Sequence, residues 1–173
     1  PYDLSDEFIE NVRAKLPELP DQKAARYAAD YGLSAYDARH LVEQPFTIEL
    51  FEGGMKVIAE AGKDAKKLAK PLANLALNDV TAYVNANAGV DLAETPLTPA
   101  RAVALVELLA SDAISSKQAK EVFAAIIEED KDPEAIVDER GMKQVSDTGA
   151  LEAIVDEVVT AHPDEVARYK EGN

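Results

Sequence analysis

The chain has 173 residues, no Cys, 6% aromatic residues, and 33 acidic against 18 basic residues, for a formal net charge of −15. These features exclude disulfides, thiolate metal sites and a cysteine nucleophile, and they disfavour binding to the phosphate backbones of DNA or RNA. A hydrophobic content of 47% is enough for a packed core, while the absence of a membrane-length apolar stretch or a signal-peptide pattern predicts a cytoplasmic protein with no membrane partner.

Caps and helix breakers divide the first part of the chain into helices. Ser5 is placed to cap a helix that ends at Pro17 and Pro20, since proline interrupts helical hydrogen bonding. The next helix is expected from Asp21 to Tyr31. Gly32 then supplies the left-handed residue that commonly follows a helix end.

The following two helices also begin with recognisable signals. Ser34 and Asp37 resemble a capping box for a short helix that runs to about Val42. Pro45 begins another helix, which contains the pair Gly53-Gly54. We expect that pair to weaken or bend the helix, because each Gly costs ~1 kcal/mol relative to Ala.

The clearest joint of the chain lies near its middle. A long helix is expected over residues 64–85, with a kink or break at Pro71. It is followed by the segment NANAGVDLAETPLTP, residues 85–99, which combines Asn, Gly and Pro and has no helical stripe. We therefore predict a hinge at residues 86–97, between two helical sub-bundles.

The second half of the chain shows cleaner helical patterns. Thr98-Pro99 begins a helix to about Ala110, and this helix is apolar nearly all round, which predicts burial. Ser115 caps an amphipathic helix, and a short helix is expected over residues 132–141. Asp147 and Pro163 begin two more. Strand alternation is absent, so the predicted fold class is all-α, an irregular multi-helix bundle.

The histidine and acidic residues do not form a recognisable metal site. Only His40 and His162 are present, and metal ligation needs several converging ligands. Asp37 lies one helical turn before His40, a spacing more typical of a surface pair. The acidic run over residues 128–132 lacks the turn glycine and terminal glutamate of a calcium loop, and it is interpreted as a solvated helix end.

The other candidates for chemistry also fail on spacing. No Gly-rich phosphate loop is present, and none of the serines lies in a nucleophile turn or near a base; they are Ser5, Ser34, Ser111, Ser115, Ser116 and Ser146. The basic cluster is interpreted as a solvated helix face; it consists of Lys63, Lys66, Lys67 and Lys70. The segment ISSKQAKEVFAAI resembles half of a helix-turn-helix, but its acidic flanks argue against DNA. We therefore predict no catalytic, cofactor-binding or metal-ligating residue.

Five segments occur in an order that resembles a known family. They are LPELP at 16–20, AARYAADYGLSAYDARHL at 24–41, ISSKQAKEVFAAI from Ile114, DPEAIVDERGMKQVSD at 132–147, and LEAIVDEVVTAHPDEVARYKEGN at 151–173. In this order they resemble the C-terminal helical domain of the aspartyl/glutamyl-tRNA(Asn/Gln) amidotransferase B subunit, GatB, and the start of its YqeY-like tail. The chain departs from the family at Ser116, where Gly is usual, and at Asn74-Leu75, where Asn-Trp is usual.

The resemblance implies a parent enzyme that converts Glu-tRNA(Gln) or Asp-tRNA(Asn) to the amide form, with ATP, Mg and ammonia from glutamine. The catalytic cradle would precede Pro1, so the resemblance implies no catalytic residue and no cofactor in this chain. It implies a helical connector over residues 1–145 and the start of the tail over residues 146–173. The A and C subunits would be partners through the parent chain, and tRNA mainly through the missing part of the tail.

The chain is accordingly interpreted as a non-catalytic fragment, consistent with a sequence that begins at Pro1 without Met. A free-standing helical protein–protein interaction module is the alternative, and a small YqeY-like protein is a third hypothesis. The end of the chain distinguishes these hypotheses, because a fragment should leave an apolar stripe uncovered there, whereas a complete module should close its core and end in a polar tail. Val166 and Tyr169 leave an apolar stripe with little chain to cover it, which favours the fragment.

Overall fold

The computed structural model describes residues 18–143, and no β-strand occurs within that range. Its helices are α2 (Pro20–Tyr31), α3 (Ala35–Leu41), α4 (Pro45–Glu60), α5 (Ala65–Asn74), the π-helix η1 (Leu75–Val80), α6 (Thr81–Ala86), the 3-10 turn η2 (Leu92–Glu94), α7 (Pro99–Ala110), α8 (Ser116–Glu129) and α9 (Pro133–Glu139). The predicted all-α class is confirmed. The helices expected before residue 17 and after residue 147 lie outside the described residues.

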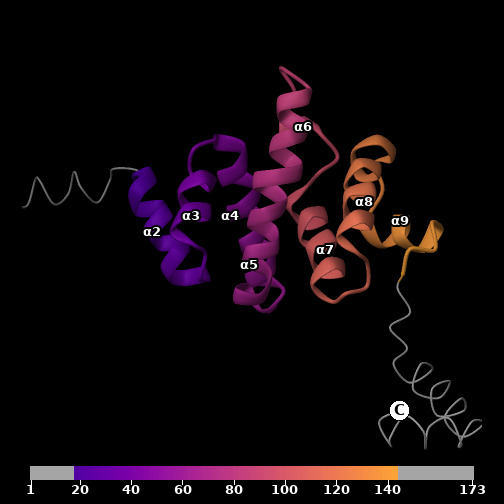
Figure 1. Cartoon of the computed structure of the whole chain (residues 1–173), viewed down its shortest axis with the longest axis horizontal. Coiled ribbons are helices and arrows are strands. Elements are labelled where there is room, and N and C mark those ends of the chain that lie inside the picture. The colour runs from indigo at the N-terminus through magenta and orange to yellow at the C-terminus, as the bar shows by residue number, and fades with distance from the viewer. Residues whose placement is uncertain (1–17, 144–173) are drawn as a thin grey trace, which may run out of the picture.

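The helices follow one another along the long axis of the molecule. Figure 1 places α2 at one end of this axis and α9 at the other, with α4, α5, α6 and α7 between them. The two ends of the described chain are therefore held apart by the helices between them.

Most helix ends are set by the local signals that the sequence contains. Gly32 adopts φ +70° after α2, and Ser34 Oγ accepts the backbone N–H of Asp37 at 3.0 Å. The Ser34 hydroxyl also donates to the Asp37 carboxylate at 2.7 Å. In a full capping box this carboxylate would instead accept a hydrogen bond from the backbone N–H of Ser34. A full capping box forms instead at α8, between Ser115 and Gln118.

Gly53 and Gly54 do not end the helix in which they lie, and the predicted weakening or bend stays a prediction. Both glycines lie inside α4, which continues beyond them to Glu60. An added Cβ at Gly54 would lie 2.5 Å from Leu72 Cδ2, and one at Gly53 would lie 2.8 Å from Pro99 Cγ. The glycines therefore allow α5 and α7 to approach α4 closely, and this packing outweighs their low helix propensity.

The break expected near Pro71 takes the form of a change in helix type. Pro71 lies inside α5, and the chain passes directly from α5 through η1 to α6. The Thr81 hydroxyl donates to the carbonyl of Ala76 at 2.8 Å, at the end of the π-helix. Pro71 therefore does not end the helix, and the helix type changes four residues after it.

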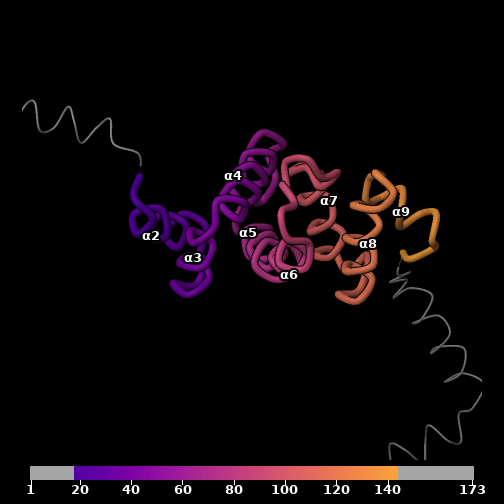
Figure 2. The backbone as a smooth tube through the Cα atoms, turned by 90° about the horizontal axis from the view of Figure 1, so that it is seen from above, coloured from indigo at the N-terminus to yellow at the C-terminus, as the bar shows by residue number. Residues whose placement is uncertain are grey.

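One hydrophobic core joins the helices on both sides of the joint. Helix α7 packs against α4 and α5, which precede the joint, and against α8 and α9, which follow it. Figure 2 shows this arrangement along the chain. Leu97 of the joint is itself buried in this core. Motion at the predicted hinge, residues 86–97, would have to separate α7 from α4 and α5. The predicted boundary between a connector and a tail, at residues 145 and 146, stays a prediction.

We predict that Gly54→Ala lowers the free energy of unfolding by about 1–3 kcal/mol, because the new methyl group overlaps the buried Leu72 side chain. Urea unfolding followed by circular dichroism measures this difference. Ala124→Gly on the exposed face of α8 is the control, and it should lose about 1 kcal/mol through helix propensity alone. A Gly54→Ala chain as stable as the natural one would contradict the close-packing role.

Candidate functional site: a polar groove on α3

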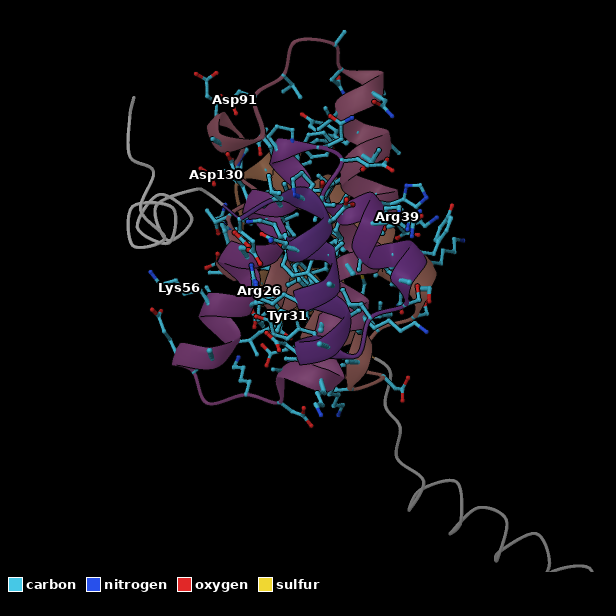
Figure 3. The ribbon with its side chains drawn as sticks, turned by 90° about the vertical axis from the view of Figure 1, so that its left-hand side faces the viewer. Arg26, Tyr31, Arg39, Lys56, Asp91 and Asp130 are labelled. Carbon is cyan, nitrogen blue, oxygen red and sulfur yellow. The ribbon has the colours of Figure 1, made fainter. Side chains whose placement is uncertain are left out.

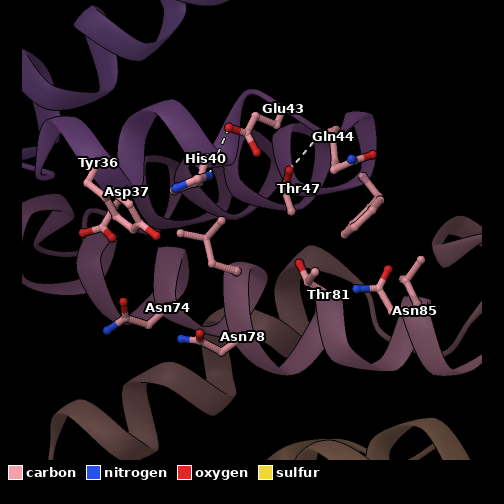
Figure 4. A pocket seen from close by; sticks show the side chains of 13 residues that line it. Tyr36, Asp37, His40, Glu43, Gln44, Thr47, Asn74, Asn78, Thr81 and Asn85 are labelled. Carbon is pink, nitrogen blue, oxygen red and sulfur yellow. Dashed lines mark hydrogen bonds and ion pairs between the residues drawn. The ribbon is translucent and has the colours of Figure 1, made fainter.

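The main groove in the described part of the chain lies between two walls of different chemistry. One wall comes from α3 and the start of α4, and the other from α5, η1 and α6; the groove has a volume of about 500 Å³ (Figure 4). The residues that line it are Tyr36, Asp37, His40, Glu43, Gln44, Phe46, Thr47, Asn74, Leu77, Asn78, Thr81, Val84 and Asn85.

The first wall combines an exposed aromatic ring with carboxylates. Tyr36 is 71% exposed, and its ring centroid lies 4.2 Å from that of His40 in an edge-to-face arrangement. His40 Nδ1 lies 3.0 Å from Glu43 Oε1. The short helix α3 places Tyr36, Asp37 and His40 on neighbouring turns, so these groups share one side of the groove.

The second wall is uncharged and combines polar with apolar side chains. Asn74, Asn78 and Asn85 are exposed along the continuous α5–η1–α6 helix. Figure 4 shows Asn74 and Asn78 on the α5–η1 side of the groove, with no hydrogen bond drawn from them to another lining residue. On the opposite wall, the buried Thr47 hydroxyl lies 2.7 Å from the carbonyl oxygens of Leu41 and Gln44. The exposed amides leave donors and acceptors available to a bound molecule.

The groove is suited to binding, and its titratable groups include the His40–Glu43 pair. Between residues 18 and 143 the structure has no group of three or more His, Asp or Glu that could hold a metal ion. Within the same range no helix is long and apolar enough to cross a membrane. The predictions of no catalytic, cofactor-binding or metal residue remain predictions for the whole chain.

The structure brings some sequence candidates into contacts that spacing alone does not reveal. His40 pairs with Glu43 and not with Asp37. In the acidic run 128–132, Glu129 pairs with Lys131 and Arg140, while Asp130 and Asp132 pair with Arg101.

The basic cluster and the serines have structural positions. Lys66, Lys67 and Lys70 are exposed, as predicted for a solvated face, and Lys63 forms an ion pair with Glu107 at 2.6 Å. Ser34 and Ser115 cap helices, Ser111 donates to the Glu107 carbonyl, and Ser116 begins α8. Ser5, Ser146 and His162 lie outside the described residues.

A cluster at the α2 end joins α2 to α4, and we call it the Glu52 cluster. Glu52 Oε1 accepts hydrogen bonds from Lys23 Nζ at 2.8 Å, Arg26 Nη2 at 2.9 Å and the Tyr27 hydroxyl at 2.9 Å. Arg26 also binds both carboxylate oxygens of Glu18, at 2.9 and 2.8 Å. Figure 3 views the molecule from this end, where Arg26 lies. The cluster fixes the start of the described chain to two helices.

The titration of the Glu52 cluster follows from these contacts. Burial raises the pKa of Glu52, but the hydrogen bonds from Lys23, Tyr27 and Arg26 lower it more, so the pKa lies below its ordinary value of 4.5. Burial, and then the hydrogen bond to Glu52, raise the pKa of Tyr27. The hydrogen bond from Arg26 lowers the pKa of Glu18 despite slight desolvation.

A second cluster, which we call the Arg101 cluster, joins the end of the joint to α8 and α9. Arg101 donates to Asp130 Oδ1 at 2.6 Å, to Asp132 Oδ1 at 2.8 Å and to the Pro96 carbonyl at 2.9 Å. Hydrogen bonds to Asp130 and then Asp132 raise the pKa of Arg101. Sequence reasoning missed both clusters, since the side chains of Glu52 and Arg101 have partners 25–31 residues away and no local signal links them.

Comparison with known proteins gives a family. Residues 56–173 match the model of the GatB domain, named GatB_Yqey. The B subunit of the aspartyl/glutamyl-tRNA(Asn/Gln) amidotransferase of Azorhizobium caulinodans is 44% identical over 98% of this chain and 32% of its own length. The proteins of the same name from Bradyrhizobium sp. strain BTAi1 and Rhizobium meliloti are 40% and 43% identical, each over 98% of this chain. The chain spans about a third of the length of these relatives.

We predict that Glu52→Gln lowers the free energy of unfolding at pH 7 by about 1 kcal/mol. This value is smaller than that of a fully buried charged hydrogen bond, because Glu52 is partly exposed and solvent screens its charge. The folded-state pKa of Glu52 lies below its unfolded value, so its contribution is present above pH 4.5 and is lost as the pH falls through the folded pKa. The difference between the two chains should therefore shrink in acid. Urea unfolding at several pH values measures it.

The matched control is Glu128→Gln, a change of the same charge at an exposed position of α8. It should leave the pH profile of stability close to that of the natural chain. A Glu52→Gln difference that stays constant from neutral to strongly acidic pH would mean that the carboxylate charge is not what stabilises the cluster.

Proposed function

The chain belongs to the GatB domain family, and from this premise we propose that it is the helical connector of a tRNA-dependent amidotransferase B subunit. In this role residues 1–145 link a catalytic cradle to a tRNA-binding tail, which begins at residues 146–173. The connector carries no catalytic residue, and its contribution is to keep the two parts at a set distance and angle.

The proposed parent activity follows from the names of the relatives, which are amidotransferase B subunits. The whole enzyme would convert Glu-tRNA(Gln) or Asp-tRNA(Asn) to Gln-tRNA(Gln) or Asn-tRNA(Asn), a carbon–nitrogen ligation that uses ATP, Mg and ammonia from glutamine. The A and C subunits would be partners through the parent chain, and tRNA mainly through the tail. The parent enzyme would act in the cytoplasm.

The observation that carries the connector proposal is the lengthwise arrangement of helices on one continuous core. Helices α2 and α9 lie at opposite ends, and α7 joins the two halves by packing against α4, α5, α8 and α9. The Glu52 cluster fixes the entering chain to α2 and α4, and the Arg101 cluster fixes the joint to α8 and α9. A spacer with such cross-links transmits position better than a flexible linker would.

A free-standing interaction module remains the second hypothesis, and the groove on α3 is the observation that favours it. The mass of the natural protein separates the two. An antibody raised against this chain should detect a band far above 18.6 kDa in a lysate of the source organism, co-purifying with two other subunits. A band at 18.6 kDa would overturn the connector proposal and favour the module.

In the complete amidotransferase, we predict that Arg101→Met raises the KM for aminoacyl-tRNA about fivefold and leaves glutamine hydrolysis unchanged. A fivefold change corresponds to a loss of ~1 kcal/mol of binding free energy through poorer orientation of the tRNA-binding tail. The reason is that the Arg101 cluster holds α7 to α8 and α9, whereas ammonia release would occur on another subunit. Steady-state kinetics of amidation and of glutaminase activity measure the two effects separately.

The control is Lys56→Met, which removes an exposed cation paired only loosely with Glu60 at 3.9 Å. This substitution should leave the KM for aminoacyl-tRNA unchanged. Equal loss of both activities in Arg101→Met would indicate misfolding or a catalytic role, and an unchanged KM would remove the Arg101 cluster from the connector proposal.

A further inference from the structure

The segment that forms α3 carries more polar and aromatic surface than the fold requires. In this segment Leu33, Ala38 and Leu41 are buried and anchor the helix to the core. Tyr36, by contrast, is 71% exposed on the groove, although it is one of the few aromatic residues of the chain. An exposed Tyr beside a groove offers a bound molecule both an apolar ring and a polar hydroxyl.

The groove has a definite charge preference. Its charged lining residues are Asp37 and Glu43, and its lining contains no Lys or Arg. The groove near Lys63 and Lys67 differs, since there Asp64, Glu107 and Glu134 lie among the lysines. In a chain with a net charge of −15, the groove on α3 attracts cations and repels phosphate.

We propose that this groove binds an extended basic segment of a partner protein, with a Lys or Arg side chain held between Tyr36 and the carboxylates of Asp37 and Glu43. The inference goes beyond the connector role and does not depend on it. It assigns a binding surface to the YGLSAYDARHL segment, residues 31–41, whose polar face the core does not use.

The α3 wall supplies the recognition of the cation. The face of an exposed Tyr attracts an ammonium or guanidinium group, and nearby carboxylates add charge-assisted hydrogen bonds. The edge-to-face contact with His40 holds the Tyr36 ring, and the Ser34 hydroxyl holds the Asp37 carboxylate at 2.7 Å. Both groups are therefore partly positioned before a ligand arrives.

The opposite wall supplies recognition of a main chain. Asn74 and Asn78 lie one turn apart, with exposed amides that each offer a donor and an acceptor. These groups match the N–H and C=O groups of an extended peptide that passes along the helix. Their lack of charge suits a neutral backbone better than a phosphate backbone.

The experiment is a titration of the isotope-labelled 173-residue chain with a capped synthetic peptide of alternating Gly, Arg and Lys, followed by amide NMR shifts. Shift changes should concentrate on α3 and on the α5–η1–α6 wall. Tyr36→Ala should weaken peptide binding about threefold or more, the scale of one exposed cation–π contact. The double variant Asp37→Asn with Glu43→Gln should weaken it about fivefold or more, the scale of one or two exposed ion pairs.

A charge-matched control is essential, because any basic peptide is attracted to a strongly acidic chain. Glu121→Gln with Glu128→Gln removes the same charge from exposed positions of α8, outside the groove. This control should change peptide affinity less than about twofold through long-range electrostatics. Circular dichroism confirms that each variant keeps its helices.

Equal weakening by the groove variant and the α8 control would overturn the proposal, as would shift changes spread over the whole surface. No effect of Tyr36→Ala would also overturn it. A parallel titration with a short RNA hairpin distinguishes the other class of ligand: RNA that shifts the groove resonances while the peptide does not would assign the surface to nucleic acid instead.

Discussion

Helix α4 faces Leu72 of α5 and Pro99 of α7 with Gly54 and Gly53, which have no side chain of their own. This close approach brings helices from both sides of the joint into one core. Without it, Leu72 and Pro99 would have to move outward, and α7 would lose its position against α4 and α5. Helix α7, which meets α4 and α5 at this contact, also packs against α8 and α9 toward the other end of the molecule.

The polar clusters form hydrogen bonds between helices that this core has brought together. Glu52 gathers three donors from α2, and Arg101 binds a carbonyl of the joint and two carboxylates beyond α8. In a chain with nearly twice as many acidic as basic residues, Lys23, Arg26 and Arg101 are engaged in cross-links between elements. The remaining acidic surface repels nucleic acid and leaves binding specificity to local features such as the groove.

The division between core and surface also separates the two proposals. The connector role depends on buried packing and on the clusters at the two ends, whereas the peptide-binding role depends on exposed groups of α3 and the asparagines of α5 and η1. A substitution of an exposed groove residue such as Tyr36 should therefore leave the connector role intact, since that side chain is not part of the core. The family assignment supports the first proposal and is neutral toward the second.

The sequence by itself determined most helix ends between residues 18 and 143, because caps such as Ser34, Thr98 and Ser115 and stops such as Gly32 act through hydrogen bonds within a few residues. It also carried the family resemblance, through motifs spread along the whole chain. Only the tertiary structure decided that Gly53 and Gly54 serve packing, that Pro71 precedes a π-helix, and that Glu52, Arg101 and Tyr36 occupy clusters and a groove. The physical reason is distance along the chain: these contacts join residues that come together only when the helices pack, and no local pattern encodes that packing.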